Sequence, residues 1–185
     1  MRIKPFRGLR PRADLAGKIP SLPYDVLDTR EARKVAEHDP YTFLHVVKPE
    51  IDLPPDVDPF DDRVYQTGRR NFDRMIEQGW LVRDPRPAYY VYRLEHGEHV
   101  QTGIAGLASL DDYREGRIKK HELTRPDKER DRARHMEAVS ANVGPVLAAY
   151  RRVPELSAVV TAVVSPAPAV DFIAPDGVRH ELWVV

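Results

Sequence analysis

The spacing of apolar residues at intervals of three and four predicts helices in four segments of the chain. They cover residues 28–38, 61–79, 126–140 and 154–164. The first has Asp28 or Thr29 as a cap, and the second ends near Gly79. We expect Thr124 to cap the third helix, with Pro126 in its first turn, because proline fits the first helical position.

Short apolar runs and runs of alternating polarity predict strands. Residues 42–47 and 144–150 are short apolar runs that we expect to be buried strands. Residues 88–95 and 98–110 predict a hairpin, and residues 171–185 predict a second one, each around a turn that contains glycine. Together with the helices, these strands predict an α+β fold of mixed sheets with hairpins and flanking helices.

The length of 185 residues permits one large domain or two small ones. We predict an N-terminal α+β subdomain in residues 1–112 and the start of a second region in residues 113–185. The last residues, Trp183-Val184-Val185, are apolar, and such a strand usually leads into further structure. We therefore expect the sequence to be a fragment, the first part of a longer protein.

Composition and charge narrow the class of protein. The 29 basic and 29 acidic residues give a net charge of zero, which argues against a general nucleic-acid binder, although a local basic patch is still compatible. The chain has no cysteine, so disulfides and thiolate chemistry are excluded. No apolar run approaches the roughly 20 residues of a membrane span, and the N-terminus lacks the apolar segment of a signal peptide. We expect a cytoplasmic protein and leave its oligomeric state open.

The densest group of chemically different side chains precedes the third predicted helix. It consists of Lys119, Lys120, His121, Glu122, Thr124 and Arg125. In a functional interpretation Glu122 is a general base, and the cations and Thr124 bind a phosphate. The alternative is a solvated loop with a capping threonine. The pair His121-Glu122 does not belong to the H-E-x-x-H zinc motif, because residue 125 is arginine.

Two further segments could contact a ligand. Residues 127–135 contain Arg130, Arg132 and Arg134, which could bind a phosphate, although the charge spacing of this run favours a solvent-facing helix. The turn Pro23-Tyr24-Asp25 could present Asp25 to a ligand or could serve only as a turn. Residues 96–99 contain two histidines at a predicted hairpin turn, without a cysteine or nearby aspartate to complete a set of ligands. We therefore predict no metal site.

Five segments carry a family resemblance. They are KPFRGLRP at 4–11, PYDVLD at 23–28, the stretch at 31–54, GRIKKHELTRPDKERDR at 116–132 and PDGVRHELW at 175–183. In this order they resemble the bacterial and archaeal family known as domain of unknown function 1015. The resemblance covers essentially the whole chain.

The resemblance implies a relation to the ParB/sulfiredoxin-like group, which includes free L-serine kinases that phosphorylate serine with a nucleotide. In those enzymes the base is a glutamate in a Pro-His-Glu-type segment, which implies this role for Glu122 beside His121. The implied cofactor is ATP or ADP with Mg. An Asp-Gly-His-His-Arg segment holds the nucleotide phosphates in those enzymes, whereas the run that begins at Asp176-Gly177 has the spacing of a hairpin turn. We therefore expect the phosphate-binding segment to lie beyond Val185.

The resulting hypothesis is a small-molecule kinase of the free-serine-kinase type, present here as an incomplete fragment. Its partners would be a nucleotide and a small-molecule acceptor. The alternative is a non-catalytic nucleotide- or partner-binding regulatory protein of the same fold. An Asp-Gly-His-His-Arg segment in a longer reading frame would favour the enzyme.

Overall fold

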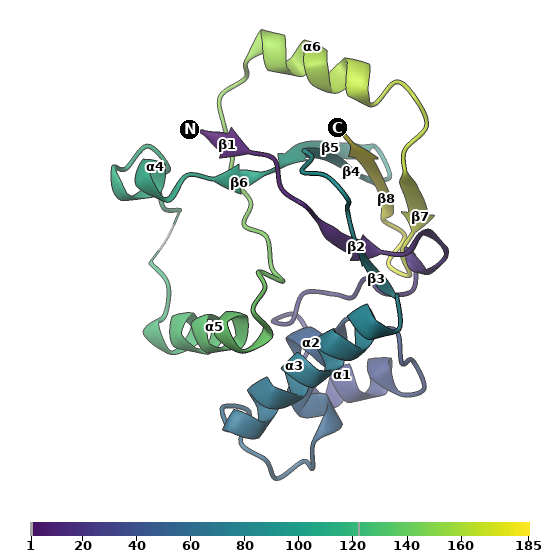
Figure 1. Cartoon of the computed structure of the whole chain (residues 1–185), viewed down its shortest axis with the longest axis vertical. Coiled ribbons are helices and arrows are strands. Elements are labelled where there is room, and N and C mark those ends of the chain that lie inside the picture. The colour runs from purple at the N-terminus through teal and green to yellow at the C-terminus, as the bar shows by residue number, and fades with distance from the viewer. Residues whose placement is uncertain (1, 122) are drawn as a thin grey trace. The chain divides into compact units, whose positions relative to one another are not determined.

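The chain forms two compact units, and each is built from segments that are separate in the sequence. Unit 1 comprises Met1–Gly17, Val82–His121 and Ala148–Val185, and unit 2 comprises Lys18–Leu81 and Glu122–Leu147. The structure, a computed structural model, describes residues 2–121 and 123–185 (Figure 1). Helices and antiparallel sheets occur together, which confirms the predicted α+β class. The two units interleave along the sequence, whereas the predicted division cuts the chain once, near residue 112.

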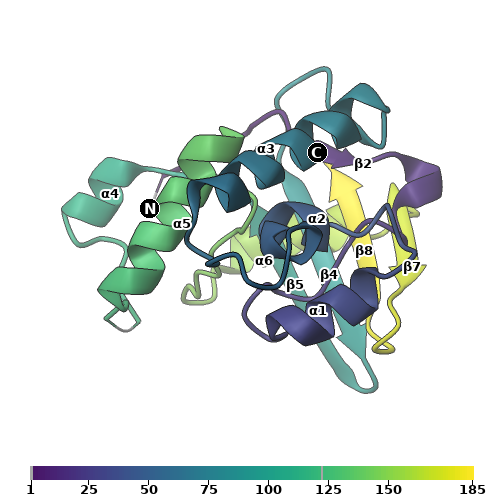
Figure 2. The same ribbon diagram turned by 90° about the horizontal axis from the view of Figure 1, so that it is seen from below.

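Unit 1 is centred on a four-stranded antiparallel sheet with the strand order β5-β4-β8-β7. The strands are β4 (Tyr90–His96), β5 (His99–Ala105), β7 (Val170–Ile173) and β8 (Arg179–Val184), and Figure 2 shows them side by side. Gly97 and Gly177 have positive φ angles of 60° and 82°, which tight hairpin turns need and glycine adopts without strain. Both predicted hairpins are confirmed.

The two faces of this sheet differ in chemistry. Glu181 is buried and accepts a hydrogen bond from Arg93 Nε at 2.6 Å, and the Arg93 guanidinium lies 5.0 Å from the ring centroid of Trp183. His180 projects to the other face, where its ring stacks on Phe172 with a centroid distance of 4.8 Å. His180 and Glu181 therefore lie on opposite faces, as the two-residue period of a strand requires.

Short elements complete unit 1. They are β1 (Ile3–Lys4) paired with β6 (Leu107–Ala108), β2 (Leu9–Pro11) paired with β3 (Leu81–Arg83), the 3-10 helix η1 (Ala13–Leu15), α4 (Leu110–Arg114) and α6 (Pro154–Val163). The hydroxyl of Tyr90 accepts a hydrogen bond from the Gly8 amide at 2.7 Å and donates one to Asp84 Oδ2 at 2.6 Å. Arg10 binds both oxygens of Asp84 at 2.8 and 2.6 Å. A buried polar cluster therefore joins the N-terminal segment to β4.

Unit 2 is helical. It contains α1 (Thr29–Ala36), α2 (Leu44–Val47), the 3-10 helix η2 (Pro49–Asp52), α3 (Asp62–Glu77) and α5 (Pro126–Val139). Its core is made by Ala32, Ala36, Leu44, Val47 and Ile51. Asp28 and Glu31 form a capping box at α1, and α5 packs against α3 (Figure 2). The described part of the chain contains no helix with both the length and the apolar character needed to cross a bilayer.

Gly68 on α3 lets the helices of unit 2 approach closely. A Cβ atom at this position would lie 2.9 Å from Pro49 Cγ, 3.2 Å from the Val46 carbonyl oxygen and 3.5 Å from His135 Nε2. A side chain would therefore separate α3 from the α2–η2 segment and from α5.

Three local predictions were wrong. Residues 42–47 do not form a strand, because 44–47 are the helix α2, whose apolar side chains are buried inside unit 2. Residues 144–150 have no regular structure, and Val146 and Leu147 are 90% and 84% exposed. Thr124 does not cap α5, because the N-cap residue is Arg125 and the Thr124 hydroxyl donates instead to the side chain of Glu129 at 3.0 Å.

Candidate functional site

The predicted functional loop begins at an anchored turn in unit 1. Gly116 follows α4 with a φ of 71°, and Arg117 then donates from Nε and Nη2 to Asp112 Oδ1 at 3.0 and 2.7 Å. The backbone N–H of Arg2 donates to Asp112 Oδ2 at 2.5 Å. This bond, followed by those from Arg117, lowers the pKa of Asp112 to about 2. The buried carboxylate therefore stays charged and fixes the start of the loop.

The next predicted site residues are exposed. Lys119, Lys120 and His121 face solvent at the end of this segment of unit 1. The Lys120 ammonium lies 5.5 Å from the ring centroid of Tyr113, which is cation–π distance. Glu122, the predicted general base, lies outside the described residues. The loop thus presents cations to solvent, and its first residues are held in place by Asp112.

Thr124 and Arg125 stand at the start of α5 in unit 2, and both are exposed. Arg125 donates from Nε and Nη2 to the carboxylate of Asp127 at 3.2 and 2.6 Å, which lowers the pKa of Asp127. The Arg125 charge is therefore already matched. These contacts favour the solvated-loop interpretation for Thr124 and Arg125.

Arg132 is the predicted site residue with the most ordered surroundings. Its guanidinium lies 4.1 Å from the ring centroid of Tyr24 and donates from Nε and Nη2 to Asp131 Oδ2 at 2.9 and 2.6 Å. Nη1 points to the carbonyl oxygen of Val47 at 3.5 Å. The side chain is 28% exposed, so the group is held in place and yet accessible. Two segments of the family resemblance, PYDVLD and the run that ends at Arg132, meet here.

The partner of Arg132 is itself positioned from α3. The Tyr65 hydroxyl donates to Asp131 Oδ1 at 2.8 Å, and burial followed by this hydrogen bond raises the pKa of Tyr65 to about 12. The hydroxyl therefore remains a donor over the physiological pH range. Asp131 is buried and accepts hydrogen bonds on both oxygens, so it can hold the Arg132 guanidinium in one orientation.

His135 extends the cluster one turn along α5. Its Nε2 lies 2.7 Å from the Val46 carbonyl oxygen and donates to it, because a carbonyl can only accept. Burial lowers the pKa of His135, so the neutral form with the proton on Nε2 is favoured. Asp25, the remaining predicted residue, is exposed and makes no hydrogen bond or ion pair with the described residues.

Sequence reasoning missed a second, largely enclosed ion pair in unit 2. Lys48 Nζ lies 3.1 Å from Glu50 Oε1, with only 13% and 12% of the side chains exposed, and the Thr29 hydroxyl donates to the same carboxylate oxygen at 3.2 Å. The available signal was the pair of opposite charges, Lys48 and Glu50, two residues apart just after the buried residues 44–47. Among the described residues, no group of three His, Asp or Glu side chains could hold a metal ion.

An open groove of about 390 Å³ lies elsewhere in unit 2. It is lined by Arg33, Lys34, Ala36, Glu37, His45, Ile51 and Asp52. His45 Nδ1 lies 2.8 and 3.0 Å from the two Asp52 oxygens, and Nε2 lies 3.1 Å from the Asp39 carbonyl oxygen. Both partners are acceptors, so the ring satisfies both only as an imidazolium. The hydrogen bond with Asp52 is the largest cause that raises the pKa of His45.

These features define an α+β protein with an anchored cationic loop in one unit and an ordered arginine cluster in the other. The chain belongs to the family described as "Protein of unknown function (DUF1015)", whose model matches residues 3–185. The family resemblance is confirmed by this match. No curated protein and no solved structure gives a significant match to the chain.

Proposed function

We propose that this protein is a nucleotide-dependent small-molecule kinase of the free-serine-kinase type, acting in the cytoplasm with ATP or ADP and Mg. The observation that carries the proposal is the cluster of Tyr24, Asp131 and Arg132, which presents an oriented guanidinium on the helix that follows the Glu122 segment. The resemblance to free-serine kinases through His121-Glu122 supplies the reaction class.

Arg132 suits the binding of a phosphate oxygen. A guanidinium has five N–H donors, and hydrogen bonds to the described residues use three of them, on Nε, Nη1 and Nη2. Two donors are thus left for an oxyanion, in a side chain held on one face by Tyr24 and along one edge by Asp131. Phosphoryl transfer depends mainly on positioning and charge stabilisation, which such an arginine supplies.

In this proposal Glu122 accepts the proton of the acceptor hydroxyl. The hydroxyl oxygen forms the new bond to phosphorus, and the bond from phosphorus to the leaving oxygen of the nucleotide breaks. The nucleotide leaves with the electron pair of that bond, and Glu122 later releases its proton to solvent. A carboxylate within direct reach, or one water, of the hydroxyl is sufficient for this step.

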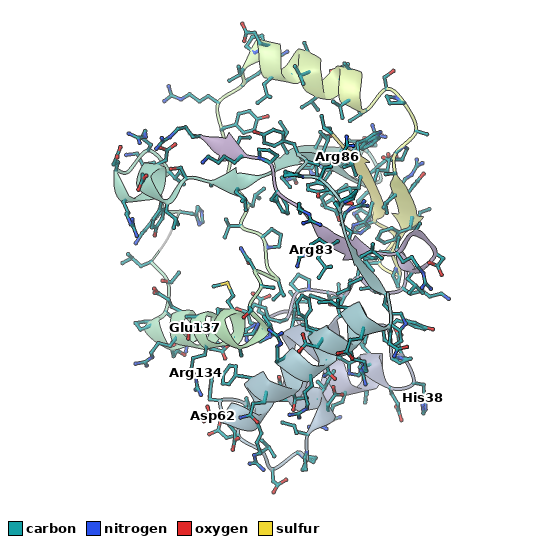
Figure 3. All side chains as sticks on the ribbon, viewed as in Figure 1. His38, Asp62, Arg83, Arg86, Arg134 and Glu137 are labelled. Atoms are coloured by element: carbon teal, nitrogen blue, oxygen red, sulfur yellow. The ribbon has the colours of Figure 1, made fainter. Side chains whose placement is uncertain are left out.

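The test compares two arginines of α5 that have matched surroundings. Arg132 lies 4.1 Å over Tyr24 and pairs with Asp131, whereas Arg134 lies 4.3 Å over Tyr65 and pairs with Asp62. Figure 3 labels Arg134 and Asp62, which are partners at the surface. Arg132→Lys and Arg134→Lys keep the positive charge but remove the planar fork.

The assay uses the longest natural reading frame that contains this chain and measures transfer of phosphate to a panel of free hydroxy amino acids with ATP and with ADP. We expect kcat/KM to fall at least about tenfold in Arg132→Lys and to stay within about twofold in Arg134→Lys. The melting temperature of each variant shows whether a loss reflects unfolding. Absence of turnover by the wild type with every donor and acceptor, or equal losses in the two variants, contradicts the proposal. Nucleotide binding without any transfer would instead favour the regulatory alternative.

A further inference from the structure

Most arginines of unit 1 that lie on a sheet have a carboxylate partner. Arg10 pairs with Asp84, Arg93 with Glu181 and Arg179 with Asp171, at 2.6 to 2.7 Å. Their charges are therefore neutralised inside the protein. Arg7 and Arg83, which flank this network next to β2 and on β3, are different.

The side chains of Arg7 and Arg83 each donate a hydrogen bond to the backbone of the other's segment. Arg7 Nε donates to the carbonyl oxygen of Asp84 at 2.9 Å, directly after Arg83 in the chain, and Arg83 Nη1 donates to the carbonyl oxygen of Arg7 at 3.3 Å. Both acceptors are neutral. Within residues 2–121 and 123–185, neither guanidinium has a carboxylate partner.

The carboxylate of Asp84, which follows Arg83 in the chain, already has other partners. Both oxygens of Asp84 accept from Arg10, and Oδ2 also accepts from the Tyr90 hydroxyl at 2.6 Å. Arg86, two residues further along, is a third exposed cation without a partner among the described residues, and Figure 3 labels it with Arg83. Arg7 and Arg83 thus place unmatched positive charge at one end of the β2–β3 ribbon, although the net charge of the chain is zero.

The two backbone hydrogen bonds also pre-order the donors. Each guanidinium has five N–H groups and uses one, so four remain on each arginine. An arginine that is already tethered loses less side-chain entropy when it binds a ligand than a free one does. Two such forks match the oxygens and the charge of −1.5 to −2 of a phosphate group, as P–O groups accept bidentate hydrogen bonds.

We propose that Arg7 and Arg83 form a binding site for the phosphate group of a small anion. The site is separate from the proposed kinase chemistry, because none of its residues is among those that the kinase proposal uses. Free phosphate and the phosphate end of a nucleotide both present such a doubly charged oxyanion to the site.

The experiment titrates the full chain with inorganic phosphate and pyrophosphate at constant ionic strength, followed by amide chemical shifts. Parallel titrations with acetate, ADP and adenosine distinguish binding of a negative charge, of a phosphate group and of the nucleobase. We expect shifts centred on Arg7, Gly8 and Asp84, with a dissociation constant of about 1 mM or tighter. ADP should bind through the same amides, whereas adenosine should not bind there and acetate should bind more weakly.

The matched control is Arg114, an exposed arginine of unit 1 that lies 3.8 Å from Asp111. We expect Arg7→Gln and Arg83→Gln each to weaken phosphate binding at least about tenfold, and Arg114→Gln to change it less than about twofold. No phosphate-induced shifts in the wild type, equal losses in all three variants, or a site that responds to Arg132→Lys instead would overturn the proposal. Loss in the first two variants with an unchanged spectrum elsewhere excludes unfolding as the cause.

Discussion

The Tyr90 hydroxyl offers the sharpest test of the packing in unit 1. Tyr90→Phe removes a single oxygen from a residue that is 3% exposed. That oxygen accepts from the Gly8 amide and donates to the Asp84 carboxylate. Leaving a buried N–H unpaired costs about 1–3 kcal/mol, and a hydrogen bond to a charged group contributes about 1.5–3 kcal/mol. Because Arg10 still holds Asp84, we expect a total loss of about 2–4 kcal/mol.

The same geometry predicts a non-additive double variant. A Cβ on Gly8 would lie 2.6 Å from Tyr90 Oη and 2.8 Å from Cζ, so Gly8→Ala should destabilise the protein by about 1–3 kcal/mol through overpacking. Tyr90→Phe removes the nearer of the two clashing atoms. The double variant should therefore lose less stability than the sum of the two single variants, by about 0.5 kcal/mol or more.

The assay is equilibrium urea unfolding of the full chain, with Tyr89→Phe as the control. Among the described residues the Tyr89 hydroxyl makes one hydrogen bond, to the Ile3 carbonyl at 3.1 Å, so its removal should cost about 1 kcal/mol or less. If Tyr90→Phe is no more destabilising than Tyr89→Phe, or if the losses from Gly8→Ala and Tyr90→Phe simply add, the described role of this hydroxyl is wrong.

Three further outcomes are expected. Gly68→Ala should lower the urea midpoint, whereas Gly144→Ala, where a Cβ meets nothing within 4 Å, should leave it unchanged; equal midpoints would refute the close approach at α3. Because the pKa of His45 is raised in the folded protein, its interaction with Asp52 stabilises the fold fully below pH 6.5, and this stabilisation is lost as the pH rises through the folded pKa. The difference in stability between the wild type and Asp52→Asn should therefore shrink with rising pH. A difference that is independent of pH would contradict the imidazolium. Asp112→Ala should speed amide exchange in residues 116–120, and unchanged exchange there would argue against the anchor.

Elements whose signals are local were predictable from the sequence. The capping box of Asp28 and Glu31 fixes the start of α1 within four residues. Gly97 and Gly177 supply the positive φ angles of the two hairpin turns. The α3 helix repeats its buried residues at helical spacing and is followed by Gly79, which also has a positive φ. In each case the determining interactions lie within a few residues.

Elements that depend on distant partners were not predictable. Residues 42–47 are a short, mostly apolar run without a clear period, so their sequence fits a buried strand and a buried helix equally. The packing of α2 against α3 and η2 stabilises the helical conformation of residues 44–47. Residues 144–150 carry the same kind of apolar run, yet they pair with no strand and are exposed. An apolar run becomes a strand only where another strand supplies its backbone hydrogen bonds.

The same limit applies to the candidate site. The charge pattern of residues 127–135 favoured a solvent-facing helix, and Arg134 fits that interpretation because it is exposed. Arg132, two residues earlier, is instead held by Tyr24, which lies far away in the sequence. The reciprocal bonds of Arg7 and Arg83 also join residues that no local pattern relates. Side chains that are far apart in the sequence become partners only through the fold.

The measurement that tests the central proposal most directly is the effect of Glu122→Gln on phosphoryl transfer. The control is Glu137→Gln, an exposed glutamate on α5 that Figure 3 labels. Gln keeps the size of the side chain but removes the proton acceptor. With the hydroxy amino acid and nucleotide that the wild type uses, loss of a general base should lower kcat by about a hundredfold to ten-thousandfold, with little change in nucleotide affinity. Glu137→Gln should stay within a few-fold of the wild type. A Glu122→Gln rate that also stays within a few-fold would contradict the kinase assignment.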